Sequence, residues 1–193
     1  MEDNQDYYID PHVYDGRPED ESDRLPKEIR TYDLLDSLNV PYKRVDHDAL
    51  PTIEACHDVD RLLDIQICKN LFLCNAQKTA FYLLMMPGGK KFKTAVLSKQ
   101  IGSARLSFAG AEFMEQYLDI TPGSVSVLGL MNDRDNQVRL LIDRDILENH
   151  EFLGCHPCIN TSSLRLRTRD LLDIVLPAIH HDYTIVDLPG EPG

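Results

Sequence analysis

Apolar residues recur along the chain at two different spacings, and these spacings predict where helices and strands form. Between Ile29 and Leu38 they recur every three or four residues, which predicts an amphipathic helix that ends before Pro41. A second helix is expected to begin near Pro51, with Ile53 among its packing residues. Further helices are predicted over residues 97–101, 111–118 and 168–176, and Thr168 is expected to cap the last of them.

Shorter apolar or alternating segments predict the strands. Two of them, residues 67–74 and 80–86, flank a turn-like sequence, and we expect them to form a hairpin. The other strands are predicted over residues 42–47, 125–131, 138–143, 163–167 and 183–186. Many short strands with a few interspersed helices indicate a mixed α/β (α+β) fold with an antiparallel-rich sheet.

The beginning of the chain differs in composition from the rest. Residues 1–24 contain nine acidic and two basic side chains, together with Pro11, Gly16 and Pro18. This composition is typical of a flexible segment. A chain of 193 residues has room for one globular domain plus such a tail. We therefore predict an acidic N-terminal extension over residues 1–25 and one domain over residues 26–189.

The net charge of −12 argues against a nucleic-acid partner only if the charge is spread evenly. Residues 87–105 contain basic side chains and no acidic one, and such a local patch can bind phosphates. These basic residues are Lys90, Lys91, Lys93, Lys99 and Arg105. Arg165, Arg167 and Arg169 form a second basic cluster. The alternative interpretation of residues 90–93 is a solvated turn.

Three features of the sequence indicate a cytoplasmic protein. No apolar run approaches the roughly 20 residues of a membrane span, so no membrane association is expected. The first residues are acidic, unlike the basic and then apolar start of a secretory signal. The five cysteines are odd in number and scattered, which favours reduced thiols over a disulfide framework.

Lys69 and Asn70 interrupt an apolar run that extends from Ile65 to Leu73. A lysine in such a run either extends to solvent at a strand end or points into a pocket. In a pocket it can bind a phosphate or a carbonyl oxygen. In a regular strand Asn70 points to the opposite face, so both side chains enter one pocket only if the strand bulges or ends there.

The segment from Gly154 to Thr161 gathers polar groups in a short loop. Gly154 permits a tight backbone path and Pro157 stiffens it. His156 can donate or accept a hydrogen bond or take part in proton transfer, and a purely structural role has equal weight. Asn160 and Thr161 either bind a ligand or stabilise the turn through bonds to the backbone.

The same loop contains a C-x-x-C sequence, formed by Cys155 and Cys158. A structural zinc site needs four ligands, commonly a second such pair, and the chain has only Cys56-His57 far upstream. A redox C-x-x-C normally opens a helix, whereas Pro157 favours a loop. The sequence therefore predicts no metal site and no cofactor.

Several segments together resemble one family. Cys68-Lys69-Asn70-Leu71-Phe72-Leu73 and the Gly-x-His-Pro-x-x-Asn-Thr loop that begins at Gly154 are the most specific. The other segments, in family order, are Val40 to Tyr42, His47 to Glu54, Lys99 to Ile101, Arg105 to Ala109 and Thr121 to Asp133. Over residues 27–189 the chain is similar to the free-standing aminoacyl-tRNA editing domains of the YbaK/ProX type, and most like the ProX branch.

This resemblance implies a fold and an activity. The fold would be a mixed sheet curled into a barrel-like core with helices around it. The activity would be that of a trans-editing hydrolase that removes alanine from tRNA for proline. Its partners would be the tRNA acceptor end and prolyl-tRNA synthetase, and no metal is needed.

The resemblance also implies roles for single residues. Lys69 and His156 would be the catalytic residues, with Lys69 near the terminal phosphate or the ester. The aminoacyl group would be bound by Asn70, Gly123, Gly129, Gly154, Pro157, Asn160 and Thr161. The basic residues between Lys90 and Arg105 would contact the tRNA.

The chain departs from the family pattern in one loop. Val127 stands where the family has proline after Gly123, and Leu128 stands where phenylalanine is common. Because that loop shapes the pocket in the family, two alternatives stay open. One is a non-catalytic module of the same fold that binds tRNA or a synthetase. The other is a deacylase for another small aminoacyl-tRNA, such as cysteinyl-tRNA for proline.

Overall fold

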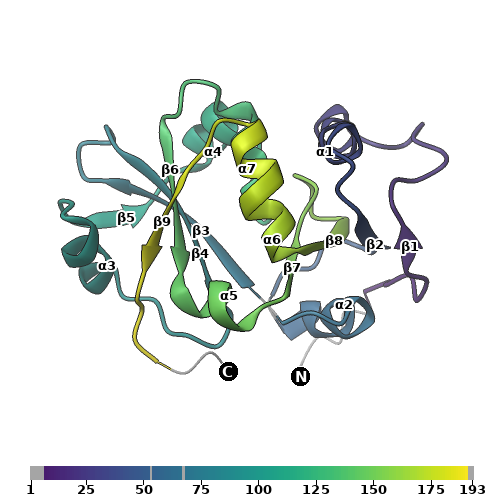
Figure 1. Ribbon diagram of the computed structural model, residues 1–193, viewed down its shortest axis with the longest axis horizontal. Helices are drawn as coiled ribbons and strands as arrows, with labels where there is room; N and C mark the ends of the chain where they lie inside the picture. The colour runs from purple at the N-terminus through teal and green to yellow at the C-terminus, as the bar shows by residue number, and fades with distance from the viewer. Residues whose placement is uncertain (1–6, 53, 67, 191–193) are drawn as a thin grey trace.

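The computed structural model describes residues 7–52, 54–66 and 68–190 and contains two β-sheets (Figure 1). The larger sheet has the strand order β5-β3-β4-β6-β9. Its strands are β5 (Leu106–Phe108), β3 (Cys68–Asn75), β4 (Phe81–Pro87), β6 (Val138–Asp143) and β9 (Tyr183–Val186). β3 pairs antiparallel with β4 and β5, which confirms the predicted hairpin, whereas β4-β6 and β6-β9 are parallel pairs.

The smaller sheet has four antiparallel strands in the order β1-β2-β8-β7. They are β1 (Tyr14–Asp15), β2 (Tyr42–Asp46), β8 (Ser162–Arg167) and β7 (Phe152–Cys155). An isolated parallel bridge joins Gln66, which precedes β3, to Leu153 of β7 in the smaller sheet. The mixed α/β class is confirmed, but the sheets are not closed into one barrel.

The apolar side chains of β4 point alternately to the two faces of the sheet, and both faces are buried. Phe81, Leu83 and Met85 face the main core, which also contains residues of the smaller sheet and of the helix α1 (Pro26–Ser37). Tyr82 and Leu84 face a second core under the helix α3 (Thr94–Ile101). A strand covered on both sides needs apolar residues at every position, as its sequence has.

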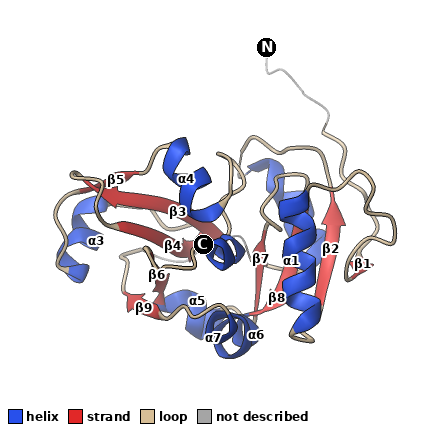
Figure 2. Cartoon of the chain, turned by 90° about the horizontal axis from the view of Figure 1, so that it is seen from above, coloured by secondary structure: helices blue, strands red, loops and turns tan. Residues whose placement is uncertain are grey.

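The remaining helices cover the sheets and the space between them (Figure 2). They are η1 (Glu54–Cys56), α2 (His57–Leu63), α4 (Ala111–Leu118), η2 (Val127–Asn132), α5 (Arg144–Asn149), and the continuous run α6 (Thr168–Asp170), η3 (Leu171–Val175) and α7 (Leu176–Ala178). Among the described residues, no helix combines the length and apolar character that a membrane crossing requires. Ile53 and Ile67, which the sequence placed in a helix and a strand, lie outside the described residues.

Two local predictions were wrong. Residues 125–131 were expected to form a strand, yet the segment Val127–Asn132 is a 3-10 helix. The Ser126 side chain accepts a hydrogen bond from the Leu128 backbone N–H and so starts the turn. A short apolar run does not reveal by periodicity whether it is a buried strand or a buried helix. Thr168 does not cap its helix; its hydroxyl donates to the His150 carbonyl oxygen at 2.5 Å.

The described part of the N-terminal segment contacts the smaller sheet. The backbone N–H of Asp10 donates to the Asp46 carbonyl oxygen at 2.9 Å, and β1 pairs with β2. Ile9 and Val13 pack against a third apolar cluster between this sheet and α2. The division into an extension over residues 1–25 and a domain over residues 26–189 stays a prediction.

A buried ion pair ties the larger sheet together at one end. Lys90 follows β4, and its side chain is only 3% exposed. Its ammonium lies 3.0 Å from both oxygens of Asp143, at the end of β6, and also pairs with Asp145. It donates to the Leu188 carbonyl oxygen at 2.9 Å. Burial opposes this charge, but the bonds to Asp145 and Asp143 raise the pKa of Lys90.

Replacing Lys90 by alanine is expected to destabilise the protein strongly. The substitution leaves the fully buried carboxylate of Asp143 without its cation, which costs about 3–5 kcal/mol. Urea unfolding followed by circular dichroism measures the change. The matched control is Lys91→Ala, because Lys91 is exposed, and it should change the free energy of unfolding by less than about 0.5 kcal/mol. Equal stability of the two variants would contradict the assignment.

Candidate functional site

A cavity of about 480 Å³ opens where the two sheets meet. Its lining residues come from the start of β3, from α2 and from the end of β7, elements that are labelled in Figure 1. One part of its wall is aliphatic and includes Leu50, Ile65, Leu71 and Val125. The rest carries polar groups, among them Thr52, Asp60, Lys69, Asn70, His156, Asn160 and Ser163.

Lys69 and Asn70 both line this cavity. Both residues lie at the start of β3, directly after its first residue Cys68. Two neighbouring side chains can therefore enter one cavity here, as the sequence analysis required of a strand end. The Lys69 ammonium donates to the Lys90 carbonyl oxygen at 2.8 Å. Asn70 Oδ1 is buried and has no hydrogen-bond partner among the described residues. The position of Lys69 therefore depends on the turn that carries Lys90.

The predicted loop brings His156 and Asn160 to the same cavity. His156 Nδ1 lies 2.9 Å from the Ser162 carbonyl oxygen, across the base of the loop. The Asn160 amide donates to the Leu50 carbonyl oxygen at 3.3 Å, which ties the loop to the opposite wall. Cys158 has a φ of 63°, a conformation rare for a residue with a side chain, and such strain is found at functional sites.

The tautomer of His156 follows from its contacts. A carbonyl oxygen only accepts, so Nδ1 carries the proton and Nε2 keeps a lone pair. Burial lowers the pKa of His156 below the ordinary value of 6.5, although the Ser162 carbonyl opposes this shift. The ring is therefore neutral at pH 7 and can accept a proton or a hydrogen bond at Nε2.

A second histidine stands behind the cavity wall, and the sequence did not single it out. His47 Nδ1 lies 2.8 Å from the Asp48 carbonyl oxygen, and Nε2 lies 2.8 Å from Ser163 Oγ. By the same argument Nε2 accepts the Ser163 hydroxyl proton, so the Ser163 oxygen offers only lone pairs to the cavity. Asp60 was also missed. Its placement depends on how α2 packs, and no local sequence signal reveals that.

The predicted glycines divide into two groups. Gly123 and Gly154 line the cavity. A Cβ on Gly154 would lie 2.2 Å from Ile65 Cδ1, so only glycine permits this close approach without movement of Ile65. Gly129 is buried in η2, where a Cβ would lie 2.4 Å from Ile120 Cδ1, and it does not line the cavity.

Two other predicted residues lie away from this cavity. Pro157 is buried in the loop and is not part of the wall. Thr161 lines a separate cavity of about 370 Å³ beside the N-terminal segment. Its carbonyl oxygen accepts from the His47 backbone N–H at 3.0 Å. Both residues thus belong to the scaffold of the loop rather than to the wall.

The cysteines of the loop are buried and reduced. Burial raises the pKa of the Cys155 thiol far above its ordinary range and that of Cys158 to about 11. Thr31 Oγ1 lies 3.6 Å from Cys158 Sγ. In the described ranges, no group of three or more His, Cys, Asp or Glu residues is arranged to hold a metal ion.

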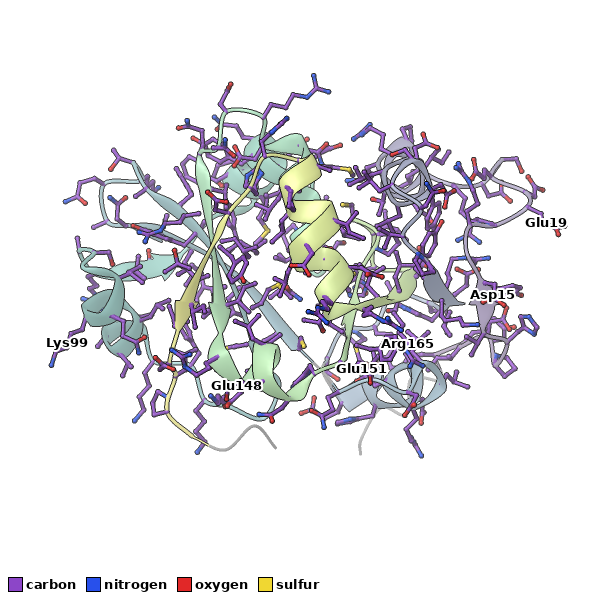
Figure 3. The ribbon with its side chains drawn as sticks, in the orientation of Figure 1. Asp15, Glu19, Lys99, Glu148, Glu151 and Arg165 are labelled. Carbon is purple, nitrogen blue, oxygen red and sulfur yellow. The ribbon has the colours of Figure 1, made fainter. Side chains whose placement is uncertain are left out.

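The basic residues predicted to form one patch differ in exposure. Lys90 does not belong to the exposed patch that the sequence predicted. Its ammonium is buried in the ion pair with Asp143 and cannot contact a phosphate on the surface. Lys91, Lys93, Lys99 and Arg105 are exposed. Figure 3 shows Lys99 pointing outward from α3 at one edge of the molecule, far from Arg165. Arg165 lies over the Phe152 ring at 3.8 Å from its centroid.

The chain is similar to known proteins in sequence and in fold. A family model described as the aminoacyl-tRNA editing domain matches residues 47–174, a range that includes every residue of the cavity wall. The prolyl-tRNA editing protein ProX of Acetoanaerobium sticklandii is 33% identical over 141 residues, which cover 73% of this chain and 85% of that protein. Prolyl-tRNA synthetase associated domain-containing protein 1 of Mus musculus is 30% identical over 156 residues, covering 79% and 91%.

A solved structure assigned as a trans-editing enzyme for prolyl-tRNA synthetase has the same fold. It superposes with a TM-score of 0.63 over 86% of this chain and 99% of that chain. The sequence identity of the pair is 16%, so this likeness concerns the fold alone.

The protonation state of His156 can be measured directly. In ¹⁵N-labelled protein at pH 7, we expect Nδ1 to be protonated and Nε2 to be unprotonated, with a titration midpoint below 6.5. Because the unfolded chain takes up this proton at a higher pH than the folded chain, the free energy of unfolding should fall as the pH drops below 6.5. The fall should be smaller in His156→Gln. A midpoint at or above 6.5 would show that the ring is solvated instead.

Proposed function

Because the chain belongs to the aminoacyl-tRNA editing domain family, we propose that it is a trans-editing deacylase for errors of prolyl-tRNA synthetase, with alanyl-tRNA for proline as its substrate. The reaction is hydrolysis of the ester between the amino acid and the terminal ribose. Water adds to the ester carbonyl, and the bond from that carbon to the ribose oxygen breaks. The products are free alanine and a tRNA with a free terminal hydroxyl.

One observation carries this proposal: Lys69, Asn70, His156 and Asn160 meet around a single cavity. An ammonium has three N–H donors, and Lys69 uses one for the Lys90 carbonyl oxygen. The others are available to the ester oxygen, where negative charge develops in the transition state, or to the terminal phosphate. The neutral His156 accepts a proton at Nε2, as assisting the attack of water requires.

The shape of the cavity supports a small aminoacyl group. Ile65 closes one side against Gly154, and Leu71 and Val125 add aliphatic surface. A synthetase pocket built for proline cannot strongly reject a smaller amino acid by binding alone, so a second sieve that accepts small residues is useful. Val127, where the chain departs from the family pattern, is fully buried in the core and does not reach the cavity.

The proposed partners are the acceptor end of the tRNA and prolyl-tRNA synthetase. Lys91 and Lys93 are exposed and follow the turn of Lys90, whose carbonyl oxygen binds Lys69. Cations at that position can meet the phosphates of an acceptor stem whose end enters the cavity. The names of the relatives support the choice of tRNA and synthetase.

Deacylation of alanyl-tRNA for proline tests the proposal. Wild-type protein should release alanine rapidly and leave prolyl-tRNA intact, with cysteinyl-tRNA for proline measured in parallel. Lys69→Ala should lower the rate by about 10²- to 10³-fold, the typical loss for a donor that stabilises a developing oxyanion. The release of labelled alanine over time gives the rate.

The matched control is Lys93→Ala, which removes an exposed lysine and should retain the hydrolytic rate at saturating tRNA. Release of cysteine alone would reassign the substrate. If none of the aminoacyl groups is released while the protein still binds tRNA or the synthetase, the chain is a binding module and not a deacylase.

A further inference from the structure

Two residues of the cavity wall carry buried acceptor atoms that no described residue satisfies. Within the described residues, four buried side-chain nitrogen or oxygen atoms have no hydrogen-bond partner, and two of them, Asp60 Oδ2 and Asn70 Oδ1, belong to residues of the cavity wall. Leaving a buried acceptor unpaired costs free energy, and more so when it is charged. Two such atoms beside one cavity indicate a ligand that donates hydrogen bonds.

Two other polar groups of the wall also offer hydrogen-bond acceptors. The Ser163 hydroxyl gives its proton to His47, and His156 presents the unprotonated Nε2, so both offer lone pairs. The Lys69 ammonium is the cation of the wall, and it is held by the Lys90 carbonyl oxygen. A ligand that matches these acceptors brings its own donors, and next to the Asp60 carboxylate it brings a positive charge.

An aminoacyl ester has one group of that kind, its α-ammonium. We infer that Asp60 and Asn70 accept hydrogen bonds from this α-ammonium, so that the cavity admits esters with a free amine and rejects hydroxyacyl esters. The inference deepens the proposed deacylase function and rests on it. The χ2 torsion of Asp and Asn has a broad energy minimum, so a small rotation turns each oxygen toward the ligand.

The surroundings of Asp60 agree with this role. Burial raises its pKa to about 6, while His57 on the same helix opposes the shift, so the carboxylate is charged at pH 7. The thiols that face it, Cys56 on η1 and Cys68 on β3, have pKa values raised by burial to about 11 and about 12. They are neutral at pH 7, and Asp60 is the acidic residue among the described residues that line the cavity.

Lactyl-tRNA for proline is the matched substrate, because a hydroxyl replaces the ammonium without a change in size. With each rate divided by the spontaneous hydrolysis of the same ester, wild-type protein should prefer the alanyl ester about 100-fold. Asp60→Asn keeps the size of the side chain and removes its charge. It should lower the alanyl rate about 10- to 100-fold and leave the lactyl rate unchanged.

Asp58→Asn is the control variant, since Asp58 lies on the same helix but is exposed and pairs with Arg61. It should leave both rates unchanged. Thermal unfolding verifies that Asp60→Asn is folded, and the loss of an unpaired buried charge should not destabilise it. Equal wild-type rates for the two esters, or an unchanged alanyl rate in Asp60→Asn, would overturn the inference while the deacylase function stands.

Binding of small probes separates this inference from the proposed function. L-Alaninamide and L-lactamide are titrated into the full chain and followed by the amide signals of cavity residues. We expect alaninamide to bind at least 10-fold more tightly, and Asp60→Asn to remove the difference. This result supports the ammonium site even if no ester is hydrolysed. Equal binding of the two probes refutes it even if alanyl-tRNA is deacylated.

Discussion

The larger sheet is held together at one end by the buried positive charge of Lys90. The Lys90 ammonium is held by Asp143, Asp145 and the Leu188 carbonyl oxygen, which together replace its hydration shell. These partners come from the end of β6, from α5 and from the segment after β9, so one side chain joins distant parts of the chain. The carbonyl oxygen of Lys90 then binds Lys69. The position of the cavity's cation therefore follows from an ion pair in the core.

The wall of the cavity combines an aliphatic part and a polar part because it lies between two sheets. Residues such as Ile65 and Leu71 form an aliphatic part of the wall, and an aliphatic wall discriminates by size. The start of β3, the loop and β8 contribute Asn70, His156 and Ser163, which present hydrogen-bond acceptors to a ligand. Size alone separates similar side chains weakly, whereas unpaired polar groups impose a much larger penalty on the wrong ligand.

Much of the fold and part of the site could be predicted from local pattern. The alternation in residues 138–143 and the apolar run of β4 correspond to strands, and the Ala111–Leu118 spacing corresponds to a helix. Lys69, Asn70 and the loop with His156 do meet at one cavity. The η2 segment and the division into two sheets were not predictable, because burial on all sides removes periodicity and strand order leaves no local signal.

The sequence by itself determined which polar residues interrupt apolar segments. Because burying an unpaired lysine costs free energy, it also indicated that Lys69 has a partner. It also determined the mixed α/β class through its two spacings. Only the tertiary structure decided which partner each polar group has. Lys90 has the same charge as Lys91, yet one is buried against Asp143 and the other is exposed. Asp60 enters the site because α2 packs against β2 and β8 of the smaller sheet, and such contacts depend on packing between segments rather than on neighbours in the chain.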